Sequence, residues 1–286
     1  MSAWNQPAVS VVIPTFERDN LIGDALESVF SQGIANVQII VVDDGSTDNT
    51  RAVVERYGPR VEYVYQKNSG PASARNNGVS RCQGDVIAFL DSDDVWLPHK
   101  LKTEMEIFRS MPEADVIISD SEHWVEDRLA FPSRFVKTDV KTASGGPEFL
   151  PDLPPLWVRR SLVSTCCLSF RGRVLDRMGL PLFDTSLGAL EDWDFEIRLY
   201  HCARTVICPH VLAKVRRYPD ITRIKRGTPN MPRTPEQLYP RLLGERRILE
   251  KSLGLPGLQS AVAERIEARI KDVGAEISDV EARLGK

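Results

Sequence analysis

Three aspartates crowd into four positions directly after an apolar run that is typical of a buried strand. Asp91, Asp93 and Asp94 follow residues 86–90 (VIAFL). Carboxylates this close repel one another and are costly to remove from water unless something positive joins them. The most direct partner is a hard divalent cation, which prefers oxygen ligands. The pattern therefore predicts a site for a metal ion and a phosphate group.

Polar turns also follow two earlier strand-like runs. Residues 14–18 (PTFER) follow residues 9–13, and Asp43 with Asp44 follows residues 37–42. Open α/β sheets bind their ligands beyond the carboxyl ends of the strands. We therefore expect the three turns to meet at one crevice.

The elements that must position these turns alternate between strand and helix patterns. Strands are expected at residues 9–13, 37–42, 61–65, 86–90, 116–118 and 205–215, with order returning also at 162–170. Helices are expected at residues 22–30, 52–57, 98–108, 173–178 and 192–202, and residues 70–81 are expected to form a loop that enters a helix. Asp19 or Asn20 would cap the first helix, and Ser46 or Thr47 the second. Repeated strand–helix units predict an α/β fold, with a Rossmann-like, mixed but mainly parallel sheet flanked by helices.

Two segments interrupt the alternation. Residues 121–157 contain many prolines and glycines without clear periodicity, as is typical of a lid or binding loop. Residues 219–240 are basic and rich in proline, which indicates a linker or mobile flap. The expected domains are therefore residues 1–220 and a basic flap with a C-terminal helical extension over residues 221–286.

The C-terminal extension carries apolar residues that alternate by four and three. Such a heptad seam is typical of helix pairing, although it is short for a coiled coil. Two interpretations stay open, a helix packed on its own domain and a homodimer contact. The seam consists of Ile266, Ile270, Val273, Ile277, Val280 and Leu284.

The composition limits the class of protein. With 286 residues, 42% hydrophobic and 27% charged, the chain fits one sizeable core with an appendage. A formal net charge of -3 gives no support to a nucleic-acid partner. Five cysteines without paired spacing are expected to be reduced, which favours a cytoplasmic protein. We expect no signal peptide and no membrane span, while peripheral contact with the inner face of a membrane stays open.

Four segments in this order resemble one known family. They are residues 9–18 (VSVVIPTFER), 40–48 (IVVDDGSTD), 70–78 (GPASARNNG) and 89–98 (FLDSDDVWLP). Together they look like glycosyltransferase family 2, the inverting, hexosyltransferase-type enzymes with the GT-A, nucleotide-diphospho-sugar-binding fold. Residues 183–184 (FD) and 191–195 (EDWDF) resemble the family's acceptor-side motif. The resemblance covers about residues 9–218, so residues 1–220 would form the GT-A catalytic domain, and the tail is not covered.

The resemblance implies a set of donor-binding residues. Pro14, Thr15 and Phe16 would line the pocket for the base, and Asp43 would accept the imide hydrogen of a uracil or thymine. Arg75 matches a donor-side arginine. Asp93 would bind manganese or magnesium, and Asp91 would reach the ribose or the metal. The complete donor set is Pro14, Thr15, Phe16, Glu17, Asp43, Arg75, Asp91 and Ser92.

The resemblance also implies the acceptor side. Inversion needs a base that removes the proton of the acceptor hydroxyl opposite the leaving group. Asp192 matches that base, and Glu191 would orient it or touch the acceptor. Trp193 would be either an acceptor platform or a core residue. Asp94 would either join the metal site or cap the next helix.

One departure from the family concerns the segment after the last strand. Tyr218 stands where many relatives carry a histidine. A phenol is a poor ligand for a hard cation at neutral pH, so Arg216, Arg217 or residues 223–226 would have to supply positive charge to the diphosphate.

The resulting hypothesis is sugar transfer from a nucleotide-diphospho-sugar, with UDP as the favoured nucleotide, to a hydroxyl of a glycan, a lipid-linked saccharide or a small molecule. One alternative is a nucleotide-sugar-binding protein with weak or lost turnover. Another is a phosphohydrolase of the haloacid dehalogenase type, with Asp91 as nucleophile and Asp93 as acid and base. That motif normally opens its domain, whereas two strand–helix units precede it here.

Overall fold

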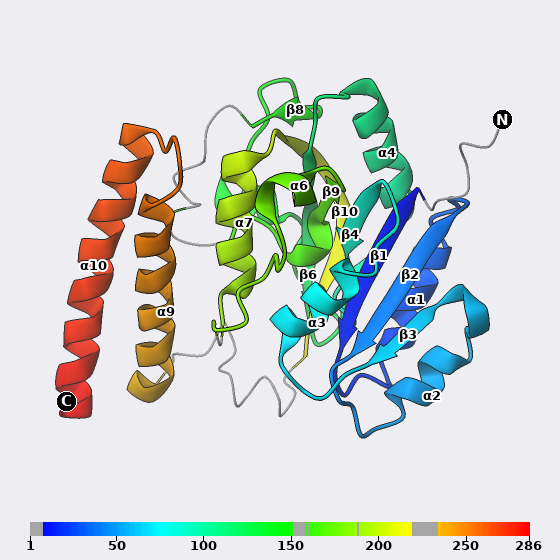
Figure 1. Ribbon diagram of the computed structural model, residues 1–286, viewed down its shortest axis with the longest axis horizontal. Coiled ribbons are helices and arrows are strands. Elements are labelled where there is room, and N and C mark those ends of the chain that lie inside the picture. The colour runs from blue at the N-terminus through cyan, green and yellow to red at the C-terminus, as the bar shows by residue number, and fades with distance from the viewer. Residues whose placement is uncertain (1–7, 151–157, 159–160, 188, 219–233) are drawn as a thin grey trace. The chain divides into compact units, whose positions relative to one another are not determined.

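The computed structural model describes residues 8–150, 158, 161–187, 189–218 and 234–286 (Figure 1). The chain divides into two compact units. The first, called the sheet unit below, comprises Met1–Pro151, Val163–Phe183 and Cys202–Arg217. The second, called the helical unit, comprises Asp152–Leu162, Asp184–His201 and Tyr218–Lys286. The domain boundary predicted near residue 220 falls outside the described residues and stays a prediction.

The sheet unit is built on a ten-stranded sheet with the order β3-β2-β1-β4-β9-β6-β10-β5, in which β7 pairs with β6 and β8 with β10. The longest pairings, β1 with β2 and β6 with β10, are parallel, whereas β9 runs antiparallel to both of its neighbours. This arrangement confirms the predicted mixed, mainly parallel α/β sheet. The strands are β1 (Val9–Thr15), β2 (Val37–Asp43), β3 (Glu62–Tyr65), β4 (Val86–Phe89), β5 (Val95–Trp96), β6 (Val116–Val125), β7 (Arg128–Phe131), β8 (Glu148–Phe149), β9 (Leu168–Arg171) and β10 (Thr205–Arg217).

The register of the central strands brings the predicted turns to one edge. Thr15 at the end of β1 pairs with Asp43 at the end of β2. On the other side of β1, Val12 pairs with Phe89, and the Leu90 amide donates to the Val12 carbonyl. Because the three strands are parallel, the segments that follow them leave the sheet on the same side.

Helices follow the strands nearly as predicted. They are α1 (Ile22–Phe30), α2 (Thr50–Glu55), α3 (Pro71–Val79), α4 (Lys100–Ser110), α5 (Arg134–Thr138), α6 (Val174–Met178) and α7 (Glu191–Cys202). The predicted caps are wrong, because Leu21 and Asn49 occupy the N-cap positions of α1 and α2 without a side-chain hydrogen bond. Ser46 and Thr47 instead bind Glu17 of the neighbouring turn.

The segment predicted to be an irregular loop contains regular structure. Strand β6 extends to Val125, and β7 pairs back onto it. The turn between them places Glu126 and Asp127 at φ values of 47° and 60°. Asparagine and glycine are the usual residues at such positions, so the pair gave no turn signal in the sequence.

Close packing of α3 against β1 gives a stability prediction at Gly78. A Cβ added there would lie 2.3 Å from Cγ1 of Val12, which is fully buried in β1. Replacing Gly78 with alanine should therefore lower the free energy of unfolding by about 1–3 kcal/mol or more. Urea denaturation measures the change, and Val12→Ala in the same chain should recover part of it.

Gly274 provides the matched control for this substitution. It lies inside a helix, and a Cβ added there meets nothing within 4 Å among the described residues. Gly274→Ala should raise the free energy of unfolding by about 0.5–1 kcal/mol through helix propensity. Equal effects at the two glycines would contradict the packing explanation.

The helical unit contains α7 and two longer helices, α9 (Pro235–Leu253) and α10 (Ser260–Leu284), which pack on each other. Ile266, Val273 and Val280 of the predicted seam are buried. The structure thus shows the intrachain alternative for the seam.

No helix in the described ranges is long and apolar enough to cross a membrane. The five cysteines are free thiols, as predicted.

Candidate active site

The turns after β1 and β2 are tied to each other. Pro14 and Thr15 are buried, whereas Phe16 and Glu17 are half-buried. The Glu17 carboxylate accepts hydrogen bonds from the Thr47 amide at 2.6 Å and hydroxyl at 2.9 Å. The buried Thr15 hydroxyl has no hydrogen-bond partner in the part of the chain that the structure describes. An unsatisfied polar group at this edge fits a surface that a polar ligand completes.

Asp43 is fully buried at the end of β2. Its Oδ1 accepts a hydrogen bond from the Ser46 amide at 2.8 Å, and its Oδ2 accepts one from the Tyr63 hydroxyl at 2.6 Å. Burial, together with the hydrogen bond to Asp43, raises the pKa of Tyr63, so the phenol stays a donor at neutral pH. Tyr63 thereby fixes the orientation of the carboxylate. Sequence reasoning missed this role, since nothing in the spacing links the two residues.

Asp44 organises the loop that leads into α3. Its Oδ1 accepts hydrogen bonds from the Gln66 side chain and the Ser69 amide, both at 2.8 Å. Its Oδ2 accepts one from the Gly70 amide at 2.8 Å, where φ is +88° and favours glycine. The carboxylate therefore holds the start of the helix that carries Arg75.

Arg75 joins α3 to residues 91–94 (DSDD), called the acidic turn below. Its Nη2 lies 2.8 Å from Oδ1 of Asp91, and its guanidinium lies 5.4 Å from the centre of the Phe183 ring. The arginine is 6% exposed, whereas the Asp91 side chain is 27% exposed. Arg75 thus holds Asp91, which is the more exposed side chain of the pair.

The rest of the acidic turn is braced from β10. The Arg216 Nε donates to the Asp93 carbonyl at 2.6 Å, and the Arg216 amide donates to Oδ1 of Asp94 at 2.9 Å. Ser92 and Asp93 are buried. Asp94 is not a helix cap, because His99 occupies the N-cap of α4. That half of the prediction for Asp94 is wrong, since its carboxylate turns towards β10 instead.

The arginines around the acidic turn differ in how exposed they are and in which carboxylates they already bind. Arg216 is 6% exposed and also pairs with Asp24, with Nη1 and Oδ2 2.6 Å apart. The Arg217 side chain is 35% exposed, and its Nη1 lies 3.9 Å from Oδ1 of Asp94. Arg18 Nη2 lies 4.0 Å from Oδ2 of Asp93. Arg217 is therefore better placed than Arg216 to meet a ligand, while residues 223–226 lie outside the described residues.

Burial and electrostatic repulsion both act on the ionisation of Asp94. Burial and the neighbouring charges of Asp93 and Asp91 raise the pKa of Asp94 to about 7. Burial alone would lower the pKa of Arg217, but the same three carboxylates raise it. Burial and the neighbouring carboxylates thus favour the neutral form of Asp94, while Arg217 opposes this effect.

A pH dependence of stability follows for the metal-free protein. The Asp94 pKa is about 7 in the folded state and ~3.9 in an unfolded chain. The folded state therefore binds more protons between these values, and stability is lost as the pH rises from about 4 to 7, by about 4 kcal/mol at most. Asp94→Asn keeps an acceptor for the Arg216 amide and should be more stable than the wild type at pH 8, with little difference at pH 4.5.

Urea denaturation in EDTA at the two pH values measures this difference. A wild type that gains stability relative to Asp94→Asn between pH 4.5 and pH 8 would contradict the assignment.

The acidic turn fits a divalent cation shared with a ligand. Among the described residues, no group of three His, Cys, Asp or Glu side chains could hold a metal ion by itself. Magnesium in proteins is commonly bound by one or two carboxylates together with substrate phosphates. Oδ2 of Asp94 is buried without a partner in the described chain, and the charges of Asp93 and Asp91 add to burial in raising the pKa of Asp94. Asp93 and Asp91 are therefore suitable oxygen donors for such a shared site.

The motif that was predicted to lie on the acceptor side is at the start of α7, in the helical unit. Glu191 and Asp192 are half-exposed. In the described part of the chain, the Asp192 carboxylate accepts a hydrogen bond from the Trp193 amide at 2.8 Å through Oδ1, which leaves Oδ2 available. Trp193 is 1% exposed, so the structure favours a core role for it over an acceptor platform.

A family model described as "Glycosyl transferase family 2" matches residues 10–171. The chain belongs to this family. An uncharacterized glycosyltransferase of Rickettsia typhi is 30% identical over 210 residues, which are 73% of this chain and 64% of that protein. The chain thus matches somewhat less than two thirds of that relative.

Two solved structures have the same fold. S. aureus TarS 1-349 in complex with UDP-GlcNAc superposes with a TM-score of 0.70 at 22% identity, over 93% of this chain and 72% of that one. Mannosyltransferase PcManGT from Pyrobaculum calidifontis, in complex with GDP-Man and Mn2+, gives a TM-score of 0.61 at 15% identity, over 99% and 77%. The predicted GT-A fold is confirmed, and the family assignment removes the support for a dehalogenase-type phosphohydrolase.

Proposed function

We propose that the chain transfers a sugar from a nucleotide-diphospho-sugar to an acceptor hydroxyl with inversion at the anomeric carbon. The observation that carries the proposal is the meeting of three parallel strand ends at one edge of the sheet. This edge collects Asp43, the Arg75–Asp91 pair and Asp93 within the segment that the family model matches. In the donor, Asp43 would contact the base, Asp91 would reach the ribose or the metal, and Asp93 would hold the metal that binds the diphosphate.

UDP is the proposed nucleotide. Asp43 is held by Tyr63 and Ser46 with each carboxylate oxygen still able to accept a second hydrogen bond, as an imide N–H of uracil requires. TarS, which shares the fold, is described in complex with UDP-GlcNAc. Thr15 and Phe16 lie at the end of the neighbouring strand and would complete the pocket for the base.

Manganese or magnesium is the proposed cofactor, held by Asp93 with help from Asp91. When bound, such a cation stabilises the negative charge that the departing nucleotide diphosphate acquires. The residues of the chain share that task, since Arg217 is partly exposed beside the turn and Arg75 holds Asp91 in place. PcManGT is described with Mn2+.

Asp192 is the proposed general base. The acceptor oxygen would attack the anomeric carbon while the bond from that carbon to the diphosphate oxygen breaks in line, and the diphosphate leaves with the bonding electrons. Asp192 would take the proton of the acceptor hydroxyl through its available Oδ2. A single displacement of this kind inverts the configuration.

The remaining parts of the hypothesis concern partners. We infer an acceptor among glycans, lipid-linked saccharides and small molecules, and a cytoplasmic location. Peripheral contact with the inner face of a membrane stays open. A homodimer through the C-terminal helix would have to use a face of α10 other than the buried seam of Ile266, Val273 and Val280.

One observation favours a second function, the binding of nucleotide-sugars with little turnover. Tyr218 stands where many relatives carry a histidine. Arg216 already pairs with the Asp24 carboxylate and donates a hydrogen bond to the Asp93 carbonyl. A panel of nucleotide-sugars with and without manganese separates the two functions. Thermal shifts identify the donor, because a ligand that binds the folded state raises its melting temperature. Release of nucleotide diphosphate with that donor supports the enzyme, and retention of intact donor supports the binder.

A further inference from the structure

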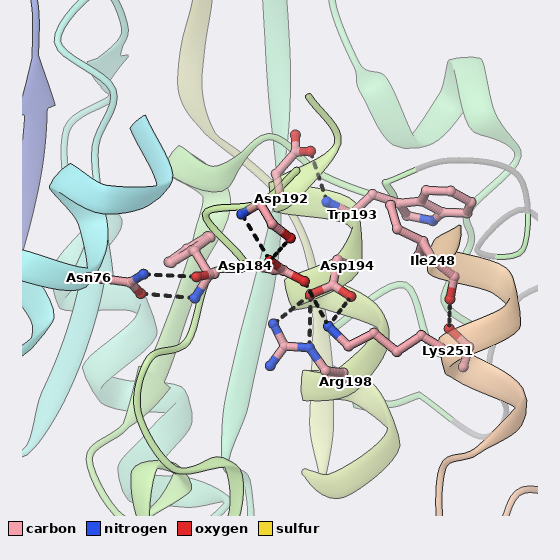
Figure 2. Close-up of polar contacts among 11 residues, drawn as sticks. Asn76, Asp184, Asp192, Trp193, Asp194, Arg198, Ile248 and Lys251 are labelled. Carbon is pink, nitrogen blue, oxygen red and sulfur yellow. Dashed lines mark hydrogen bonds and ion pairs between the residues drawn. The ribbon is translucent and has the colours of Figure 1, made fainter. Parts of the chain in front are cut away.

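A charged cluster lies behind the acceptor-side motif in the helical unit (Figure 2). Asp194, two residues after Asp192, has a side chain only 2% exposed. Its Oδ2 accepts hydrogen bonds from Nε and Nη2 of Arg198 at 2.9 Å and 2.7 Å, and its Oδ1 accepts one from Nζ of Lys251 at 3.0 Å. A carboxylate this buried is costly unless cations and hydrogen bonds satisfy it. Lys251, from α9, therefore belongs to the support of α7.

Lys251 also reaches the segment that precedes the motif. Its Nζ lies 3.4 Å from Oδ2 of Asp184, and Oδ1 of Asp184 accepts hydrogen bonds from the Ser186 amide and hydroxyl at 3.0 Å and 2.5 Å. The Ser186 hydrogen bonds and the Lys251 charge lower the pKa of Asp184 to about 2, so this group is ionised at neutral pH. One ammonium group thus connects residues on both sides of Asp192.

The backbone at this point needs outside support. Leu190, directly before the motif, has a φ of 70°, a left-handed conformation that is costly for a residue other than glycine. Such strain persists where the surrounding structure holds it. Helix α9 lies against this residue, because a Cβ at Gly244 would lie 4.0 Å from Cδ1 of Leu190. At the other end of α7, Nε2 of His201 lies 2.8 Å from the carbonyl oxygen of Pro256.

We propose that Lys251 is a positioning residue for the catalytic base. Residues two apart on a helix point in directions roughly 200° apart around its axis. Anchoring Asp194 to Lys251 therefore holds α7 by one face while Asp192 stays on another. The same ammonium group restrains Asp184 and, with it, the approach to the strained Leu190. The inference rests on the proposed role of Asp192 and assigns a function to the tail, which the family model does not cover.

Lys251→Met tests the proposal, because methionine keeps much of the stem and removes the charge. The matched control is Arg246→Met on the same helix, whose partner is Glu250, with both side chains 49% exposed. We expect Lys251→Met to lower kcat by about 10-fold to 100-fold, as misplacement of a reacting group does. The donor Kd and donor KM should not change. Arg246→Met should match the wild type, and Lys251→Arg should recover most of the kcat.

A merely structural ion pair would give a different pattern. It would lower the melting temperature and the fraction of active protein, while kcat per folded molecule would stay at the wild-type value. That result overturns the proposal, as does Lys251→Arg being as impaired as Lys251→Met. If Lys251→Met does not fold, Asp184→Asn removes the weaker half of the bridge, and a kcat and donor KM both equal to wild type would then overturn it.

Different results would refute the proposed function and the role of Lys251. A wild type that transfers no sugar from any donor of the panel refutes the proposed function, and the role of Lys251 falls with it. A wild type that is active, with Asp192→Asn inactive and Lys251→Met unaffected, refutes the role of Lys251 alone.

Discussion

Replacing Asp192 with asparagine should lower kcat for sugar transfer by about 10²-fold to 10⁴-fold, the usual contribution of a general base. Asparagine keeps an oxygen that can accept the Trp193 amide hydrogen bond, so the start of α7 should keep its geometry. The residues that we propose to bind the donor lie in the sheet unit, so we expect the dissociation constant of the donor to stay at its wild-type value. Steady-state kinetics and a donor titration measure the two quantities.

Glu191→Gln is the matched neighbouring variant. We propose that Glu191 orients the base or touches the acceptor, so its loss should act mainly on the acceptor KM and lower kcat less than Asp192→Asn does. Full activity of Asp192→Asn would remove this residue from the mechanism. A larger loss of kcat in Glu191→Gln would transfer the role of base to Glu191.

Replacing Asp93 with alanine should have two effects of opposite sign. Without ligand, the variant should be at least as stable as the wild type at pH 8, because the charge of Asp93 is one cause of the raised pKa of Asp94. With donor and manganese, the stabilisation of the wild type, about 2.7 kcal/mol at a ligand concentration of 100 times Kd, should be largely lost. Thermal or urea denaturation with and without both ligands measures each effect.

Asp139→Asn is a suitable control for Asp93→Ala. Asp139 pairs with Lys141 at the surface, and both side chains are 80% exposed. This variant should keep the wild-type response to donor and manganese. An equal manganese-dependent shift in Asp93→Ala and the wild type would exclude Asp93 as a metal ligand.

The central strands and their turns could be predicted from the sequence because local signals agree there. The apolar runs before Asp43 and Asp91 are buried strands with polar residues at their carboxyl ends, as the pattern indicates. The partners of these residues were not predictable. Tyr63 and Arg216 reach the site only through pairing of β3 and β10 with other strands, and strand pairing between distant segments has no local signature.

In the C-terminal segment, the sequence contains a local signal for the start of a helix, but the nearby prolines favoured a linker in the prediction. Pro235 and Pro240 suggested a linker, yet Pro235 occupies the first turn of α9, where a proline needs no amide partner. Thr234 and Gln237 form a capping box, a signature that is visible in the sequence. Recognising it would have predicted α9, although the contact of Lys251 with Asp194 would still have required the structure.

The stereochemical course of transfer tests the central claim most directly. With the donor that gives the largest thermal shift in manganese, proton NMR of the first-formed product reports the configuration at the anomeric carbon. The proposed single displacement by an acceptor that Asp192 deprotonates predicts a configuration opposite to that of the donor. A product with the donor's own configuration, or an intact donor after prolonged incubation with a range of acceptors, would contradict the mechanism.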